Sequence, residues 1–161
     1  MAGMVSFVHY GSLRVAASAQ RDFDNAVAYL SRDPVERALF DRLEHGAQRV
    51  TLTANHHDAD DYDPNTHTIR WDPHSALRTA AGGRQSPALG LGHEVDHAVH
   101  DGPREWQRSL TPDARYDTAE ERRVITGSER HAARTLGEAV RHDHGGATYR
   151  VASPTAMHLL A

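Results

Sequence analysis

Residues 93–97 of the chain read His-Glu-Val-Asp-His, which is an H-E-x-x-H motif. In a helix, residues four positions apart lie on one face, so the imidazoles of His93 and His97 can hold one Zn²⁺. Glu94 would lie beside the open coordination position, where a carboxylate can take a proton from a zinc-bound water. The spacing therefore predicts a hydrolytic zinc site with Glu94 as its base.

A catalytic zinc site keeps three protein ligands and one open position, so a third ligand must come from elsewhere in the chain. The extended motif H-E-x-x-H-x-x-G-x-x-H is absent, because position 100 is His and position 103 is Pro. A glutamate on a later helix is the alternative, and the candidates are Glu120, Glu121 and Glu129. Glu120 and Glu121 lie in the charged run AEERR, which is also typical of a solvated helix face. Glu129 follows Thr-Gly-Ser and starts a helix, and spacing alone does not decide among the three.

The helix that would carry the motif is visible in the apolar residues around it. From residue 87 to about residue 100 they recur at helical spacing, and a Pro follows at 103. Gly90 and Gly92, just before the motif, allow a neighbouring backbone to approach closely. The candidate glutamates would lie on two short helices, 118–126 and 129–136, with a break at Gly127.

The remaining segments predict short strands and two more helices. Helical spacing within residues 20–45 is interrupted at Asp33-Pro34, where Asp33 is a natural N-cap, and Gly46 closes the second helix. Strands are expected in MVSFVHY before Gly11, at 48–53, at 66–71 and near 149–151. We expect strands 48–53 and 66–71 to pair as a hairpin across a polar turn, and residues 75–86 to form a loop. The result is a single α+β domain, 1–161, with a small antiparallel sheet.

The composition excludes several classes of protein. The chain has no Cys, which rules out disulfides, thiolate metal sites and a Cys nucleophile, and its 13 His leave imidazole and carboxylate as transition-metal ligands. A net charge of -4, without a dense run of cations, argues against nucleic-acid binding. The mean hydropathy is -0.65, and no run approaches the roughly 18 apolar residues of a spanning helix. The opening MAGMVSFVHY lacks the features of a signal peptide.

A zinc peptidase also needs a donor for the oxyanion that forms when water attacks the carbonyl. The Gly-rich segment after residue 137 offers Tyr149, Arg141 or a protonated histidine, His142 or His144. These residues are also compatible with a surface loop. Asp96, inside the motif, either orients a ligand histidine or faces water. His100 is expected to cap the C-terminal end of the motif helix.

Several stretches of the sequence resemble one known family. They are GHEVDHAVH (92–100), EERRVITG (120–127) and SERHAARTLG (128–137), followed by Arg141 and Tyr149. The family is that of the NleD-like effector metallopeptidases, zinc peptidases found as bacterial type III effectors and as toxin domains at the ends of type VI VgrG spike and Rhs proteins. The segment TIRWDP (68–73) also resembles the family's strand before the motif helix. The likeness covers about 90 of the 161 residues, and Arg130 stands where the family commonly has Asn.

The resemblance implies a zincin-like metallopeptidase and a role for individual residues. Glu129 would be the third zinc ligand beside His93 and His97, with Glu121 as the next choice. Catalysis would fall to Glu94 as the base, with Tyr149 and Arg141 near the oxyanion. The strand from Thr68 to Trp71 would offer its edge to an extended peptide substrate.

The resemblance also implies a biological setting. The domain would be secreted by a bacterial secretion system into a target cell, either into a bacterial periplasm or into a host cytoplasm. It would be fused to a secretion spike as the C-terminal toxin domain of a larger protein, and it would cleave a protein of the target cell. An antibacterial role would require a cognate immunity protein.

Two other classes of function fit the same residues. In the first, zinc only stabilises a small, non-catalytic binding module. Glu94 separates this class from an enzyme, because a structural zinc site has no need of a carboxylate beside an open position. In the second, the chain is an interaction domain without metal.

Overall fold

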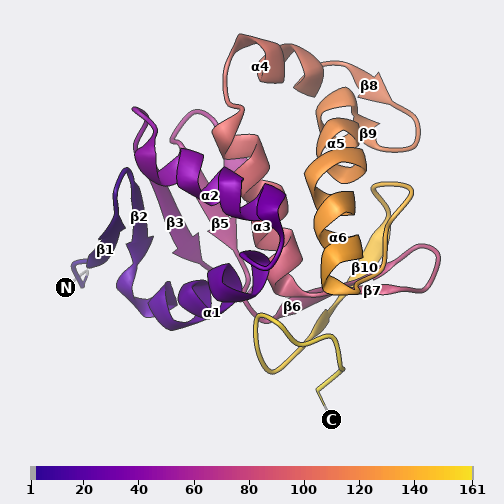
Figure 1. Ribbon diagram of the computed structural model, residues 1–161, viewed down its shortest axis with the longest axis horizontal. Helices are drawn as coiled ribbons and strands as arrows, with labels where there is room; N and C mark the ends of the chain where they lie inside the picture. Colours follow the sequence, from indigo (N-terminus) through magenta and orange to yellow (C-terminus); the bar gives the residue numbers. More distant parts are fainter. Residues whose placement is uncertain (1–2, 161) are drawn as a thin grey trace.

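The computed structural model describes residues 3–160, which form an α+β fold, as the sequence predicts. The larger sheet has five strands in the order β1-β2-β3-β5-β4 (Figure 1). Their bounds are β1 Phe7–Tyr10, β2 Leu13–Ala16, β3 Val50–Ala54, β4 Asp61–Asp63 and β5 Thr68–Trp71. The first two strands join through a tight turn at Gly11, whose φ of 60° favours a residue without a side chain.

The pairing inside this sheet differs from the expected hairpin. Strands β3 and β5 are parallel, with Leu52 opposite Ile69. Between them in the sequence, the segment expected to be a polar turn contains β4, which pairs antiparallel with β5. The sheet is therefore mixed and not purely antiparallel. The expectation was wrong because β4, Asp-Tyr-Asp, is only three residues long, too short to be recognised without its partner.

The two helices predicted within residues 20–45 are α1 (Gln20–Leu30) and α2 (Pro34–His45). A short 3₁₀ turn, η1 (Ala17–Ala19), leads into α1. The carboxylate of Asp33 caps α2 by accepting a hydrogen bond from the backbone N–H of Glu36 at 3.0 Å, and Gly46 ends the helix. Both helices pack against the motif helix, so they form the support behind the site.

The motif helix, α3 (Pro87–Val99), is the centre of the fold. It contacts α1 and α2, the strands β4 and β5, and the later helix α5. Eleven of its 13 residues are therefore buried, including the polar residues of the motif. The indole N–H of Trp71 donates a hydrogen bond to the carbonyl of Pro87 at 2.9 Å and ties the start of the helix to β5. The packing holds the motif side chains in a fixed position.

Residues 75–86 are not a loop but a hairpin of β6 (Ser75–Thr79) and β7 (Arg84–Gln85). The strand β6 also pairs antiparallel with β10 (Gly146–Arg150), which gives a second sheet in the order β10-β6-β7. The small residues of this segment carry no local strand pattern. They form a strand because their partner comes from the far end of the chain.

The segment after α3 carries the candidate glutamates. It contains α4 (Pro103–Ser109), the short strands β8 (Pro112–Asp113) and β9 (Asp117–Thr118), and then α5 (Ala119–Val124), η2 (Ile125–Glu129) and α6 (Arg130–Leu136). Gly127 has a non-helical φ of -101° and ψ of -109°, which confirms the predicted break between two short helices. The helices α5 and α6 form one column beside α3 (Figure 1).

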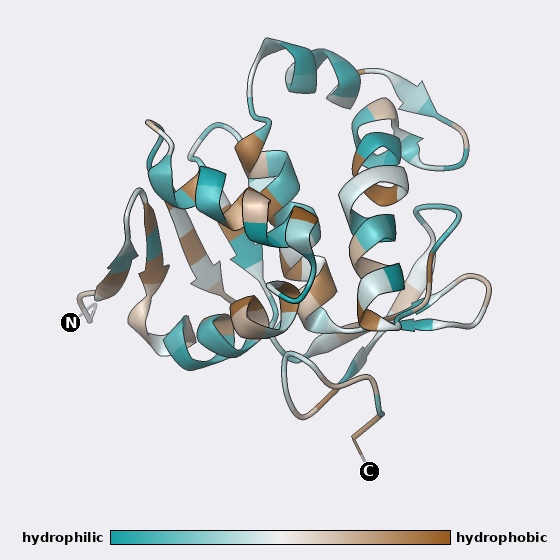
Figure 2. Cartoon of the chain, viewed as in Figure 1, coloured by the Kyte–Doolittle hydropathy of each residue, from teal (hydrophilic) through white to brown (hydrophobic). Residues whose placement is uncertain are grey.

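Apolar residues gather in the core of the fold, and polar residues predominate on its outer helices. Figure 2 shows that α4, at the top of the view, is almost wholly hydrophilic. The core lies between the larger sheet and α1, α2, α3 and α6, with Phe23, Leu52, Ile69 and Leu91 among its fully buried residues. Within residues 3–160, no helix combines the length and the apolar character needed to cross a membrane.

Candidate metal centre

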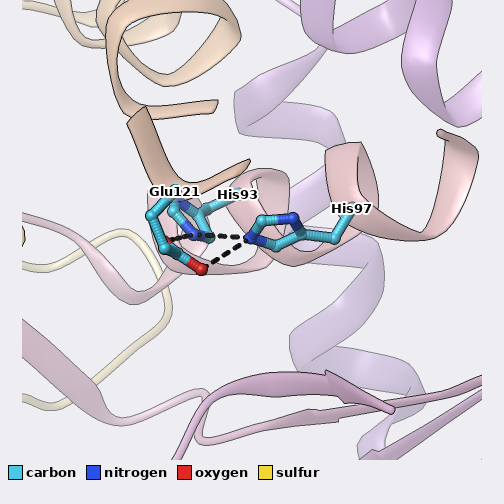
Figure 3. Close-up of side chains that lie close together, drawn as sticks. All are labelled: His93, His97 and Glu121. Carbon is cyan, nitrogen blue, oxygen red and sulfur yellow. Dashed lines mark hydrogen bonds and ion pairs between the residues drawn. The ribbon is translucent and has the colours of Figure 1, made fainter. Parts of the chain in front are cut away.

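Three side chains from two helices converge at the middle of the fold (Figure 3). The Nε2 atoms of His93 and His97 are 3.1 Å apart. The Oε2 atom of Glu121 lies 2.9 Å from Nε2 of His93, and its Oε1 lies 3.1 Å from Nε2 of His97. Four-coordinate zinc with bonds of about 2 Å places neighbouring ligand atoms roughly 3.3 Å apart. The separations therefore fit three ligands of one ion.

The chemistry of the donors fits zinc as well. Both imidazoles are buried, and Oε2 of Glu121 lies 2.9 Å from Nε2 of His93 and 3.3 Å from Nε2 of His144. A carboxylate that faces imidazole nitrogens at these distances needs either a proton on a ring or a shared cation between them. Two imidazoles and one carboxylate form a known ligand set for catalytic zinc. We conclude that His93, His97 and Glu121 are able to hold a metal ion.

This arrangement corrects the choice of third ligand that the resemblance implied. Glu129 lies on the opposite side of the His93 ring, with its Oε2 2.7 Å from Nδ1. The two nitrogens of an imidazole point in different directions, so Glu129 cannot bind an ion held by Nε2 of the same ring. Glu121, the second choice, is the glutamate that reaches the shared position. The reason is the direction in which α5 packs against α3, and the spacing of residues along the chain does not predict that direction.

Glu129 and Glu120 instead contact the two candidate ligand histidines at Nδ1, the ring nitrogen that does not face the shared position. The carboxylate of Glu129 is beside Nδ1 of His93, and that of Glu120 lies 3.3 Å from Nδ1 of His97. A hydrogen bond donated by Nδ1 to a carboxylate leaves Nε2 free to bind metal and fixes the orientation of the ring. In the charged run AEERR, Glu120 is only 2% exposed and does not lie on a solvated face, whereas Arg122 is exposed.

Arginines fix these supporting carboxylates in turn. Arg141 donates to Glu129 from Nε at 2.7 Å and from a terminal nitrogen at 2.8 Å. Arg108 and Arg123 each donate to Glu120 at 2.5 Å. Burial raises the pKa of each glutamate, but the hydrogen bonds from the arginines and histidines outweigh it and bring both pKa values to about 2. Both supporting groups are therefore ionised at neutral pH.

Asp96 is buried and does not face water, which decides between the two interpretations from the sequence. Its Oδ1 accepts a hydrogen bond from Arg123 at 2.8 Å and lies 2.7 Å from Nδ1 of His100, while its Oδ2 accepts one from the hydroxyl of Ser128. Arg123 also holds Glu120, so Asp96 acts on His97 through two intermediates. His100 is the C-cap residue of α3, as expected, and its Nδ1 lies 3.0 Å from the carbonyl oxygen of Asp96.

The two glycines before the motif make room for side chains and not for a backbone. A Cβ atom at Gly92 would lie 2.5 Å from Oε2 of Glu36, and one at Gly90 would lie 2.7 Å from Oδ2 of Asp60. Both carboxyl groups are close to the site, and burial raises the pKa of each to about 8. Neither Glu36 nor Asp60 was predicted from the sequence, although the glycines indicated a close approach at these positions.

Glu94 lines a cleft of about 610 Å³ that opens over the two histidines. Burial raises its pKa, and the charges of His93 and His97 oppose this rise. A carboxylate whose pKa lies above its ordinary value is better suited to receive a proton near neutral pH. The predicted base is therefore at the cleft surface, on the same helix as the ligand histidines.

The structure separates the candidate oxyanion donors. Arg141 and His144 line the cleft, and Nε2 of His144 is 3.3 Å from Oε2 of Glu121. The hydroxyl of Tyr149 instead donates a hydrogen bond to the carbonyl of Met157 at 2.8 Å, away from the residues that line the cleft. Tyr149 is therefore not among the residues that border the cleft, unlike Arg141. The position of Tyr149 in the family pattern does not specify the direction in which its side chain points from β10.

The strand expected to offer its edge to a substrate, β5, is not an edge strand. β5 (Thr68–Trp71) is an inner strand with β3 on one side and β4 on the other, so its edges are already paired. β4 is the edge strand, and Asp61 and Tyr62 from this strand line the cleft. Within the larger sheet, the free edge at this cleft is thus the edge of β4.

Comparisons of the chain with models of protein families, with curated proteins and with solved structures find no match.

Proposed function

We propose that this protein is a zinc-dependent peptidase whose ion is held by His93, His97 and Glu121. The observation that carries the proposal is the convergence of these three side chains next to Glu94 in an open cleft. Zinc bound there would supply a Lewis acid that polarises the substrate carbonyl and makes water more acidic. A purely structural zinc site is normally closed by four protein ligands, and here three ligands face a cleft.

The residues around the ion have distinct tasks in this proposal. Glu94 accepts a proton from a water molecule in the cleft and passes it to the leaving amine. His144 and Arg141 border the same space and supply hydrogen-bond donors where negative charge develops on the carbonyl oxygen. Glu129 and Glu120 keep the two ligand histidines in the tautomer that binds metal.

A peptide is the substrate class that suits the cleft. The free edge of β4 runs beside it, and an extended peptide can add to such an edge through main-chain hydrogen bonds. The resemblance to NleD-like peptidases supports the same reaction. It also supports delivery by a bacterial secretion system, a protein substrate in the target cell and an immunity protein for an antibacterial role.

Metal content tests the ligand assignment. We expect about one zinc per chain, lost in His93→Ala, His97→Ala and Glu121→Ala. In Glu129→Gln the metal should bind more weakly by about 10–100-fold, the usual effect of removing a group that orients a ligand. Elemental analysis at equal protein concentration is the measurement. Zinc retained in Glu121→Ala but absent from Glu129→Gln would return the third-ligand role to Glu129.

Glu94→Gln tests the enzymatic role. The variant should fold, keep its zinc and lose peptide hydrolysis by about 10²–10⁴-fold, because the base is gone and the ligands remain. Toxicity on expression in bacterial cytoplasm, bacterial periplasm and eukaryotic cells should fall in parallel and would identify the target compartment. If the variant is as toxic as wild type in each compartment, zinc serves a binding module and the peptidase proposal fails.

A further inference from the structure

The cleft contains a buried carboxylate that the metal centre does not use. Glu105 on α4 is 6% exposed and lines the cleft, and one of its oxygens is within 4.8 Å of a ring nitrogen of His97. Its Oε1 accepts a hydrogen bond from the hydroxyl of Ser109 at 2.7 Å. Within residues 3–160, no arginine or histidine nitrogen comes within 4.0 Å of this carboxylate.

The other carboxylates of the cleft have a charge partner or another task. Glu94 and Glu121 belong to the metal centre, and Asp60 has a pKa raised to about 8 by burial, which keeps it protonated at neutral pH. The ion pairs are Asp61 with Arg70 at 2.5 Å, Glu129 with Arg141 at 2.7 Å, Asp58 with Arg150 at 3.3 Å and Glu120 with Arg108 at 2.5 Å. Asp117 is exposed at the rim. Glu105 is thus the buried carboxylate of this cleft without a cation.

Acidic side chains are almost never buried unless a cation or a metal accompanies them. A hydroxyl one turn away satisfies one lone pair of Glu105 but does not balance its charge. A second metal ion between His97, Glu105 and Glu120 is disfavoured, because Arg108 and Arg123 already occupy both oxygens of Glu120. A cation that enters the cleft from outside would balance the charge of Glu105.

An aromatic ring in the same cleft suits an organic cation with a long aliphatic chain. Tyr62 of β4 also lines the cleft, and Asp101 accepts a hydrogen bond from its hydroxyl at 2.6 Å, which fixes the ring. The methylene groups of lysine and arginine pack on apolar surfaces while their charged ends reach a carboxylate. We infer that the cleft selects peptides with a lysine or arginine next to the bond to be cleaved, and that Glu105 binds the cationic side chain. This inference rests on the proposed peptidase function.

The first test uses the zinc-loaded wild-type protein and a mixture of random decapeptides whose products are sequenced. Lysine or arginine should be enriched at one position beside the cleavage site. A peptide chosen from the products is then made in two forms, with arginine or with its neutral analogue citrulline at that position. The ratio of kcat/KM for arginine over citrulline should be at least about tenfold, since a buried charge pair contributes more than an exposed one.

The matched variants are Glu105→Gln and Asp41→Asn. Glu105→Gln keeps the size of the side chain and an acceptor for Ser109, and it should cleave both peptides at similar rates. Asp41→Asn removes the same charge from an exposed position on α2 and should keep the wild-type ratio. Calorimetric binding of both peptides to zinc-loaded Glu94→Gln should show the same preference without turnover.

The outcomes separate this inference from the proposal beneath it. Zinc-loaded wild type that cleaves no peptide in the mixture would overturn the peptidase proposal and this inference with it. Cleavage with equal rates for arginine and citrulline would overturn the inference alone, and this comparison does not depend on whether Glu105→Gln folds. A second equivalent of zinc that is lost in Glu105→Gln would also overturn it, because the cation would then be a metal ion.

Discussion

Glu36 lies beneath the motif helix and makes the stability of the protein depend on pH. Its side chain is fully buried on α2 against Gly92 of α3, and neither carboxyl oxygen has a hydrogen-bond partner within residues 3–160. Burial raises its pKa from 4.5 to about 8, and the negative charges of Asp33 and Asp96 add to the effect. The folded protein therefore holds a proton on Glu36 at neutral pH.

This pKa shift has a defined sign and size in the free energy of unfolding. Between pH 4.5 and about 8 the folded protein binds one proton that the unfolded chain has released. Stability therefore falls as the pH rises, by about 1.4 kcal/mol per pH unit. The stability is fully present below pH 4.5, and over this interval the loss from Glu36 alone is on the order of 5 kcal/mol.

The substitution Glu36→Gln tests this reasoning. An amide does not titrate, so any cost of burying it is the same at every pH. We expect the free energy of unfolding of the variant, relative to wild type, to rise by about 4 kcal/mol between pH 5 and pH 8.5. Urea denaturation at a series of pH values measures it, with zinc removed and with zinc bound.

A control and a refuting result complete this experiment. Asp41→Asn removes one negative charge from the exposed surface of the same helix and controls for the general effect of that loss. A free-energy difference between Glu36→Gln and wild type that stays constant from pH 5 to pH 8.5 would show that Glu36 is ionised in the folded protein. The assignment of a protonated carboxyl beneath α3 would then be wrong.

Three other substitutions test the packing and the charges around the site. Gly92→Ala should destabilise the protein by about 1–3 kcal/mol in urea denaturation, because its Cβ would lie 2.5 Å from Oε2 of Glu36; wild-type stability would refute the close approach. Ionised Glu129 stabilises wild type above its ordinary pKa of 4.5, and this contribution, on the order of 3 kcal/mol, is lost as the pH falls to about 2. Glu129→Gln should lack this contribution. Circular dichroism measures the acid transition, and an unchanged transition in the variant would refute the reasoning. Trp71→Phe should cost about 1–3 kcal/mol by leaving the Pro87 carbonyl without its donor, yet retain zinc, and loss of the metal would show that this bond positions the motif.

Local interactions explain the parts of the fold that the sequence alone determined. The N-cap at Asp33, the end of α2 at Gly46 and the break at Gly127 each depend on residues within a few positions of one another. The same holds for the pair His93 and His97, since one turn of helix is enough to bring their Nε2 atoms to 3.1 Å. The motif helix and its candidate metal ligands were therefore predictable before any tertiary contact was known.

Contacts between distant segments decided the rest. The parallel pairing of β3 with β5 and the strand β6 depend on partners that leave no mark on the local pattern. The choice of Glu121 over Glu129 as third ligand depends on how the column of α5 and α6 lies against α3, since both glutamates reach His93 but from opposite sides of its ring. A spacing along the chain specifies which side chains share a helix face. Only the packing of two helices specifies which nitrogen of an imidazole a carboxylate meets, and for this reason the sequence predicted the pair of histidines but not the complete ligand set.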